Sequence, residues 1–250
     1  MNMKFEDKVT TLRIKKHKGR ETEAFLLDVK KMAEGEPLEY LLGEVDFCSA
    51  KVDLSLRPMI PRPETEFWVQ TAIEEIRDTR REFVLRGLDL FSGSGAIGLA
   101  VLKNIPEANM DFIEFDPTLK EQIEISILRN NIKKTRTRVL TGDTWDGAQG
   151  TYDIIFAVPP YVPKEMKEEV MKELSAENPL SFFDKENGYY YHKQILSRAK
   201  EFLKEKGALY LEFDITQREN IERLALDYGF TGVHFFRDPY GHECALAITH

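Results

Sequence analysis

The sequence predicts an α/β fold in which helices cover both faces of a mostly parallel sheet. From residue 84 onward, short apolar runs alternate with helical stretches, which is the rhythm of βαβ units. A glycine-rich segment near residue 93 also separates an apolar strand from a helix, as the first turn of a doubly wound sheet does. With 250 residues, 42% of them hydrophobic, the chain has room for one large domain and a small appendage.

Residues 1–55 are expected to form that appendage, and residues 56–250 the main domain. Between residues 21 and 32, apolar side chains recur at helical spacing, at Phe25, Leu26, Val29 and Met32. Residues 45–54 then alternate around a polar centre, which predicts a short β-hairpin.

A helix is predicted over residues 63–78, at the entrance to the main domain. Two prolines, at positions 61 and 63, fix an extended approach to this helix. Glu64 and Glu66 fall in its first turn, where acidic side chains suit the helix dipole. Arg62, Glu64 and Glu66 admit two interpretations, a solvent-facing helix start or a role in closing a site.

Seven strands are predicted in the main domain, and the linker before the last one favours antiparallel pairing. That linker is rich in turn-forming residues. The predicted strands cover residues 84–90, 111–115, 138–140, 152–157, 208–213, 232–236 and 244–249.

The composition argues against several classes of protein. The net charge of −8 and the pI of about 5.3 disfavour a broad nucleic-acid surface, and a basic run at residues 15–20 is interpreted as a solvated segment. The two cysteines are too far apart in sequence for a disulfide framework, and the histidines lack metal-ligand spacing. The charged N-terminal segment and the lack of a long apolar run predict a cytoplasmic protein without a membrane span.

The glycine-rich segment, residues 88–98, predicts a nucleotide-binding turn. Because glycine has no Cβ atom, the backbone there can approach a ligand closely and direct its N–H groups toward it. Alone, the pattern also fits a dinucleotide site or a plain strand-to-helix turn. The candidate cofactor-binding residues in this turn are Asp89, Phe91, Ser92, Gly93, Ser94 and Gly95.

Two later segments are candidates for binding the rest of the nucleotide. Glu114 ends the next strand, about 20 residues after the turn, where a carboxylate can accept hydrogen bonds from ribose hydroxyls. Phe115 either packs on an adenine ring or lies in the core. Asp143 is a candidate acceptor for the exocyclic N–H of adenine, with Thr144 and Trp145 lining the same pocket.

The loop after the fourth predicted strand distinguishes between these cofactors. It reads Phe-Ala-Val-Pro-Pro-Tyr, and with it the chain resembles the class I S-adenosylmethionine-dependent methyltransferases, specifically the HemK/PrmC family. That family methylates the glutamine side chain in the Gly-Gly-Gln motif of peptide-chain release factors. The resemblance extends from about residue 36 to residue 250, and its most specific part is Ile-Pro-Arg-Pro-Glu-Thr-Glu at residues 60–66.

The resemblance implies a Rossmann-like, seven-stranded fold with S-adenosylmethionine as donor and S-adenosylhomocysteine as product. It also implies a monomeric enzyme whose partner is a release factor, docked by residues 1–55, although this segment is shorter than the docking domain of the family. Catalysis is assigned to the loop of Val158, Pro159, Pro160 and Tyr161. In the family, an Asn side chain before the first proline and the carbonyl of that proline accept hydrogen bonds from the target NH₂, and the tyrosine covers its flat face.

Two residues depart from the family pattern. Val158 replaces the Asn or Asp before Pro-Pro-Tyr and offers no acceptor, a loss that commonly costs a factor of about 10² to 10³ in rate. Phe91 replaces the first glycine of the turn, a form that resembles some RNA and DNA methyltransferases. Two alternatives therefore stay open: an RNA or DNA amino-methyltransferase, which the acidic balance disfavours, and a cofactor-binding homologue without turnover that docks a partner.

Overall fold

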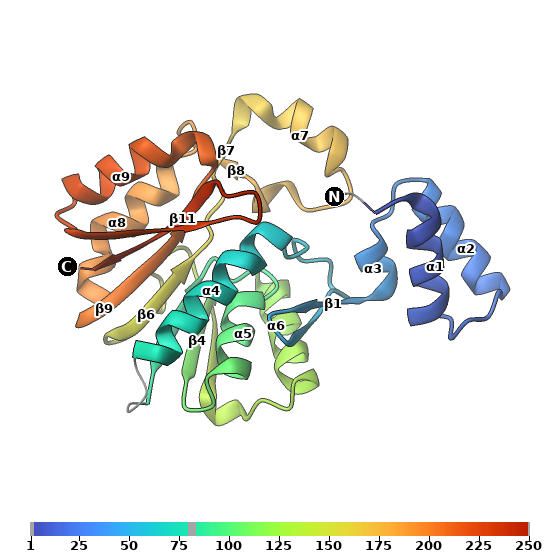
Figure 1. Ribbon diagram of the computed structural model, residues 1–250, viewed down its shortest axis with the longest axis horizontal. Helices are drawn as coiled ribbons and strands as arrows, with labels where there is room; N and C mark the ends of the chain where they lie inside the picture. Colours follow the sequence, from blue (N-terminus) through green and yellow to red (C-terminus); the bar gives the residue numbers. More distant parts are fainter. Residues whose placement is uncertain (1–2, 80–83, 250) are drawn as a thin grey trace.

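A computed structural model describes residues 3–79 and 84–249 of the chain. Residues 1–2, 80–83 and 250 of the two predicted domains lie outside this part. Within it lies one seven-stranded sheet, as predicted, and its strand order is β10-β11-β9-β6-β3-β4-β5 (Figure 1). Its strands are β3 (Arg86–Leu90), β4 (Asn109–Glu114), β5 (Thr137–Thr141), β6 (Tyr152–Ala157), β9 (Leu203–Glu212), β10 (Gly232–Arg237) and β11 (Glu243–Thr249).

Strand direction follows the predicted pattern. β11 runs antiparallel to both of its neighbours, β9 and β10, whereas the other pairs in the sheet are parallel. The carboxyl ends of β3, β4 and β6 therefore meet at one edge of the sheet. This is the edge at which doubly wound folds place their ligands.

Helices cover both faces of the sheet, and each face has its own apolar core. α4 (Pro63–Thr79), α5 (Ala96–Asn104) and α6 (Pro117–Arg129) cover one face, while α8 (Tyr190–Phe202) and α9 (Arg218–Asp227) cover the other. The central strand β6 contributes Ile154 and Phe156 to the first core and Ile155 and Ala157 to the second. This alternation is the two-residue period of a strand that is buried on both sides.

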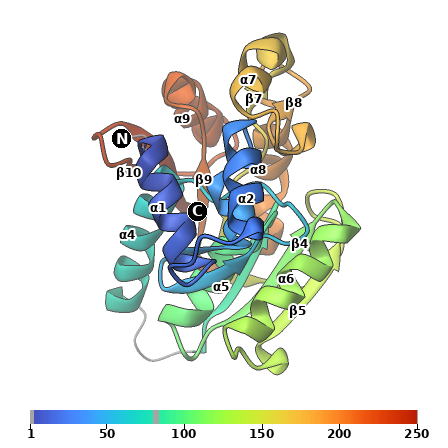
Figure 2. The same ribbon diagram turned by 90° about the vertical axis from the view of Figure 1, so that its right-hand side faces the viewer.

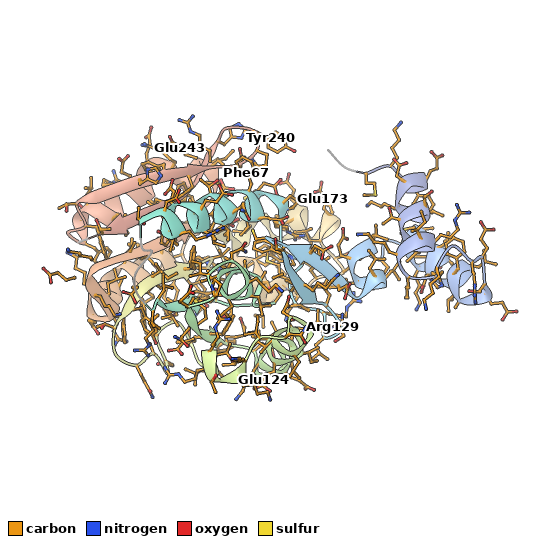
Figure 3. The ribbon with its side chains drawn as sticks, turned by 60° about the horizontal axis from the view of Figure 1, so that its bottom comes forward. Phe67, Glu124, Arg129, Glu173, Tyr240 and Glu243 are labelled. Atoms are coloured by element: carbon orange, nitrogen blue, oxygen red, sulfur yellow. The ribbon has the colours of Figure 1, made fainter. Side chains whose placement is uncertain are left out.

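The N-terminal helices form a small lobe that stands apart from the sheet (Figures 1 and 2). The lobe consists of α1 (Phe5–Lys15), α2 (Glu23–Ala33) and α3 (Leu38–Leu42). Its core is separate from those of the main domain and contains Leu12, Phe25, Met32, Leu38 and Leu41. Figure 3 shows the same lobe beside the main domain from another side, with the side chains drawn as sticks.

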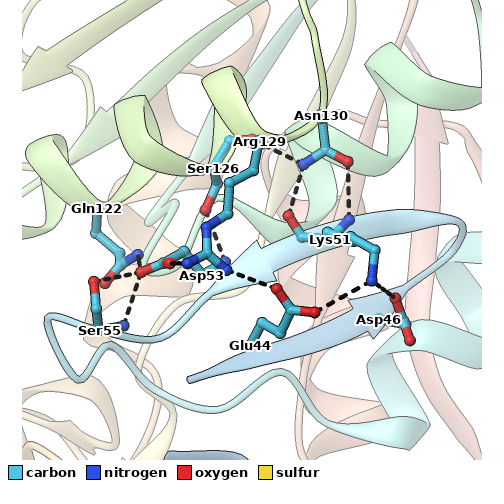
Figure 4. Close-up of polar contacts among 9 residues, drawn as sticks. All are labelled: Glu44, Asp46, Lys51, Asp53, Ser55, Gln122, Ser126, Arg129 and Asn130. Carbon is cyan, nitrogen blue, oxygen red and sulfur yellow. Dashed lines mark hydrogen bonds and ion pairs between the residues drawn. The ribbon is translucent and has the colours of Figure 1, made fainter. Parts of the chain in front are cut away.

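A hairpin of β1 (Glu44–Phe47) and β2 (Ala50–Asp53) joins this lobe to the main domain. It packs against α5 and α6, and Phe47 and Val52 belong to the first core. Polar contacts also fix the hairpin on α6 (Figure 4). The buried carboxylate of Asp53 accepts a hydrogen bond from Gln122 at 2.8 Å and pairs with Arg129 at 2.8 Å, and the amide of Asn130 bonds both the N–H and the carbonyl of Lys51.

An insertion between β6 and α8 lies above the carboxyl edge of the sheet. It contains β7 (Val162–Pro163), the 3-10 helices η2 (Lys164–Met166) and η3 (Pro179–Ser181), α7 (Lys167–Glu173) and β8 (Phe183–Asp184). Two more 3-10 helices, η1 (Lys134–Arg136) and η4 (Ile215–Gln217), complete the described elements. None of the helices in the described residues is both long and apolar enough to cross a bilayer.

Candidate active site

Three adjoining cavities lie at the carboxyl edge of the sheet, and Met59 and Val158 line all of them. The diproline cavity, of about 300 Å³, is lined by Arg62, Pro159, Tyr161, Val162, Val170, Glu173, Leu174, Ser181 and Phe182. The glycine-turn cavity, of about 260 Å³, includes Phe91, Gly93, Glu114, Phe115, Asp143, Thr144, Pro160, Asn178, Ser181 and Tyr191. The smaller inner cavity includes Asp89, Ser92, Gly93 and Ser94.

The glycine turn is held by hydrogen bonds from the strands beneath it. The N–H of Gly93 donates to Oε2 of Glu114 at 2.7 Å, and the hydroxyl of Ser92 donates to the carbonyls of Asp89 and Ile113. Gly93 and Gly95 both have positive φ, a backbone region that glycine enters at little cost. Gly95 shapes the turn without lining any of the three cavities.

Asp89 supports the turn from below. Its Oδ2 accepts a hydrogen bond from the N–H of Gly98 at 2.9 Å, which ties the end of β3 to the first turns of α5. Burial, reinforced by the nearby charge of Glu114, raises the pKa of Asp89 to about 8, although the Gly98 N–H acts in the opposite direction. Asp89 is therefore largely protonated in the folded protein at neutral pH.

Phe91 occupies the backbone conformation that glycine would favour. Its φ is +58°, in the left-handed region, which costs a non-glycine residue about 1–2 kcal/mol. Its ring packs edge-on against that of Tyr191, with centroids 5.2 Å apart, and forms part of the wall of the glycine-turn cavity. The phenylalanine thus lines the cavity.

Of the residues predicted after the turn to bind the nucleotide, all but Trp145 line the glycine-turn cavity. Glu114 is buried and also accepts a hydrogen bond from the N–H of Asp116 at 2.9 Å, and burial raises its pKa. Phe115 is 63% exposed and therefore is not a core residue. Asp143 and Thr144 line the cavity, as expected.

The expectation that Trp145 lines this pocket is wrong. Its side chain is buried in the second core, where it stacks on Phe202 with ring centroids 4.7 Å apart. Its indole N–H donates to the carbonyl of Gln194 at 3.1 Å. The tryptophan follows two cavity residues in sequence, but the turn at 142–147 directs it toward α8. It therefore anchors the Asp143 loop and does not line the cavity.

One side chain of the diproline loop, that of Tyr161, contacts the buried carboxylate of Glu212. The hydroxyl of Tyr161 donates to Oε1 of Glu212, at the end of β9, at 3.1 Å. Burial and the adjacent carboxylate raise the pKa of Tyr161 well above its usual value, so the phenol stays protonated. Val158 packs against the first core and brings no polar atom to the cavities that it lines.

Glu212 connects the diproline loop to the start of α4. Its Oε2 accepts hydrogen bonds from the hydroxyl of Thr65 and the indole N–H of Trp68, both at 2.7 Å. Burial raises the pKa of Glu212, although these three donors act in the opposite direction. Sequence reasoning missed this residue, yet a glutamate at the end of an apolar strand was the signal that identified Glu114.

The other residues of the Pro-Arg-Pro-Glu-Thr-Glu segment bind different parts of the chain. Arg62 pairs with the buried carboxylate of Glu177 at 2.7 Å, and Glu177 also accepts the N–H of Ile60. Glu66 accepts the N–H of Cys48 at the hairpin turn, whereas Glu64 is exposed. For Arg62 and Glu66, the structure thus favours a role in assembling the site. For Glu64 it favours the solvent-facing alternative.

No group of three or more potential metal ligands occurs among the residues that the structure describes. The cavities are lined by carboxylates, hydroxyls, aromatic rings and backbone groups. A cavity with a buried carboxylate joins a second cavity beside a diproline loop, and this arrangement suits group transfer between two bound molecules.

Comparison with known proteins defines the class. The family model for the methyltransferase small domain matches residues 73–182. The catalytic domain of hMettl16, solved in complex with a MAT2A 3′UTR hairpin, has a TM-score of 0.66 over 98% of this chain and 90% of that one, at 14% identity. The ribosomal protein L11 methylase of Lactobacillus delbrueckii subsp. bulgaricus has a TM-score of 0.57 over 80% and 84%, at 16% identity. The fold is that of a class I methyltransferase, and S-adenosylmethionine is its methyl donor.

Sequence relatives define the family. The release factor glutamine methyltransferase of Streptococcus pneumoniae is 31% identical over 82% of this chain and 71% of its own length. Those of Thermodesulfovibrio yellowstonii and Bacteroides thetaiotaomicron are 31% and 30% identical, over 88% and 92% of this chain and 78% and 80% of theirs. This chain belongs to the release factor glutamine methyltransferase family.

Proposed function

We propose that this protein transfers the methyl group of S-adenosylmethionine to the side-chain amide nitrogen of glutamine in the Gly-Gly-Gln motif of a peptide-chain release factor. One observation carries the proposal: the glycine-turn cavity and the diproline cavity share a wall at Val158. A donor in the first cavity and an amide in the second would meet there. The names of the relatives support the release factor as substrate.

The glycine-turn cavity fits the nucleotide part of the donor. Glu114 uses two of its lone-pair positions on N–H groups, which leaves acceptor capacity for ribose hydroxyls. The exposed ring of Phe115 is available to pack on adenine, and Asp143 to accept its exocyclic N–H. When bound, the donor supplies an electrophilic methyl group next to a sulfonium.

The diproline loop supplies one acceptor for the target amide. The carbonyl of Pro159 makes no hydrogen bond with any described residue, so it is available as an acceptor. This carbonyl would orient the amide NH₂, and the Tyr161 ring, fixed through Glu212, would form the wall beside it. Orientation and electrostatics are the main contributions that an enzyme makes to such a displacement.

The remaining expectations concern the compartment, the oligomeric state and nucleic acid as a substrate. Peptide release takes place on ribosomes, so the enzyme would act in the cytoplasm. We also propose that the enzyme acts as a monomer. Nucleic acid is disfavoured as a substrate by the net charge of −8.

The proposal is tested with radiolabelled S-adenosylmethionine and a purified release-factor domain. We expect label in the domain that carries Gly-Gly-Gln and none in a matched domain whose motif glutamine is replaced by alanine. Total RNA serves as the competing substrate in a parallel reaction. Labelling of RNA with an unlabelled release factor would reject the proposed substrate.

A further inference from the structure

Position 158 lacks the side-chain acceptor that the family usually has there, so another group must orient the NH₂ of the target glutamine. A glutamine NH₂ has two N–H bonds, and its nitrogen attacks well only when both are directed away from the line of transfer. The Pro159 carbonyl can accept one of them. Val158 cannot accept the other, so a second acceptor must come from elsewhere in the chain.

The wall shared by the two large cavities restricts where that acceptor can lie. Three residues line both the diproline cavity and the glycine-turn cavity: Met59, Val158 and Ser181. The methyl group must cross this wall to pass from donor to amide. A thioether is a weak acceptor and a valine is none, so the hydroxyl of Ser181 is the one strong side-chain acceptor on it.

The structure holds Ser181 firmly in place. Its N–H donates to the carbonyl of Asn178 at 3.1 Å, within η3. The carbonyl of the next residue, Phe182, accepts the N–H of Val162 at 2.9 Å, which fixes this segment beside the diproline loop. On the other side, the Arg62–Glu177 ion pair anchors the start of the segment.

The Ser181 hydroxyl is also free to act. It forms no hydrogen bond with any residue that the structure describes, and the residue is half-buried. Loop hydroxyls nearby are engaged; that of Ser92, for example, donates to two carbonyls. A hydroxyl that rotates freely can donate to water and still offer its lone pairs to an amide N–H.

We infer that Ser181 is a catalytic residue that replaces the missing acceptor, its Oγ accepting the second N–H of the target amide while the Pro159 carbonyl accepts the first. This inference rests on the proposed function. In the step itself, the lone pair of the amide nitrogen forms the bond to the methyl carbon as the carbon–sulfur bond breaks and the sulfur keeps that electron pair. The extra proton on nitrogen then leaves to water, and Ser181 stays neutral throughout.

A matched control for Ser181 is a serine outside the cavities. Ser197 is exposed on α8 and lines none of the three cavities. Its hydroxyl donates to the carbonyl of Gln194 at 3.0 Å. Ser197→Ala therefore removes a serine hydroxyl from a position away from the proposed site.

The experiment measures kcat, KM for the release-factor domain and the Kd for S-adenosylmethionine in five variants, including Val158→Asn as the reference for the double variant. We expect Ser181→Ala to lower kcat by about 10-fold to 100-fold, with a donor Kd within about twofold of the parent. Ser181→Thr, which keeps the hydroxyl, should stay within about threefold, and so should Ser197→Ala. Combined with Val158→Asn, Ser181→Ala should cost no more than about threefold, because the asparagine restores the acceptor.

Three results would overturn the inference. These are an unchanged kcat in Ser181→Ala, an equal loss whether or not Val158→Asn is also present, or a loss in Ser197→Ala that equals the loss in Ser181→Ala. The parent enzyme separates this inference from the proposed function. If the parent does not label the Gly-Gly-Gln domain at all, the function is wrong and the inference with it; if it does, a null result for Ser181→Ala rejects the inference alone.

Discussion

Val158 is the residue on which the chemistry of this site depends, since it borders every cavity at the sheet edge without contributing a polar atom. Valine is comfortable there structurally, because it packs against the first core at the end of a buried strand. Its effect is therefore expected on turnover and not on folding.

Val158→Asn should raise kcat for the release-factor domain by about an order of magnitude or more. The reason is that the amide oxygen of asparagine would take over the second N–H from Ser181, and an oxygen fixed in direction is better preorganised than a hydroxyl that rotates freely. Steady-state kinetics measure the change. The control is Val158→Leu, which keeps the position apolar and should not gain activity; an equal or lower rate in Val158→Asn would contradict the assignment of this loop.

The raised pKa of Asp89 predicts that the free energy of unfolding depends on pH. An unfolded chain loses this proton near the ordinary Asp pKa of about 3.9, whereas the folded protein keeps it up to about pH 8. Between these values the folded state binds the extra proton, so the stability that Asp89 contributes falls as pH rises. Asp89→Asn cannot titrate but can still accept the Gly98 N–H.

Urea unfolding of Asp89→Asn and the parent across pH 5 to 8 measures this effect. The free energy of unfolding of the variant, relative to the parent, should increase steadily with pH over that range. Other carboxylates contribute equally to both proteins and cancel in the difference. A difference that stays constant with pH would show that Asp89 has no raised pKa.

Individual site residues were predictable where a local pattern fixes them. Gly93 and Glu114 follow from a strand-turn-helix pattern and its spacing, and the structure joins them by a hydrogen bond. Trp145 was misplaced because sequence proximity to Asp143 does not reveal which way a tight turn directs a side chain. Glu212 was missed because its partners on α4 lie about 150 residues away in the sequence.

At the scale of elements, the first turn of α4 is the part that assembles the site. At the start of α4, three residues contact three different parts of the chain. Arg62 contacts the insertion, Thr65 the end of β9 and Glu66 the hairpin. The buried carboxylate of Glu212 relays the position of α4 to Tyr161 of the diproline loop. Glu212 is thus a positioning residue that acts through Tyr161.

Glu212→Gln should lower kcat about tenfold while the Kd for S-adenosylmethionine stays within about twofold. An amide has a single acceptor oxygen, so it cannot satisfy the three donors that the carboxylate now satisfies. Thr65→Val is the control, because it removes one donor on the α4 side and leaves Tyr161 bonded. It should lower stability by about 1 kcal/mol without a loss in kcat. Equal losses in kcat would show that Glu212 acts through α4 alone.

The strands of the sheet were predictable because each contains a short apolar run that lies between polar segments. The predicted helix at 63–78 also matches α4 to within one residue. By contrast, α1 and the insertion with α7 were not anticipated. α1 buries only Leu12 and α7 buries none of its residues, so neither carries a clear apolar stripe at helical spacing.

At the scale of the whole molecule, the lobe of α1–α3 presents apolar side chains that nothing in the described chain covers. Leu26 and Leu27 on α2 are 60% and 53% exposed. Their exposure supports our proposal that residues 1–55 dock the release factor. The lobe has its own core, so changes on its surface should leave the catalytic site intact.

The double variant Leu26→Ser and Leu27→Ser should raise KM for the release-factor domain about tenfold or more. It should leave both kcat at saturation and the Kd for S-adenosylmethionine unchanged, because the affected contacts hold substrate and transition state equally. Leu226→Ser is the matched control, since this leucine on α9 is 52% exposed on the main domain. An equal rise in KM for the control, or none in the double variant, would contradict docking by the lobe.

The contacts of Asp53 and Asn130 with the hairpin set the reach of the enzyme. They clamp the hairpin onto α6, and the hydroxyl of Tyr40 on α3 ties the lobe to the main domain a second time, at the carbonyl of Pro58, so the lobe is a fixed arm and not a swinging one. A partner held by this arm must extend its glutamine loop across a constant span to the cleft. The enzyme would then select partners by the length of their glutamine loop. A loop that is too short ends before the diproline loop, whatever its sequence.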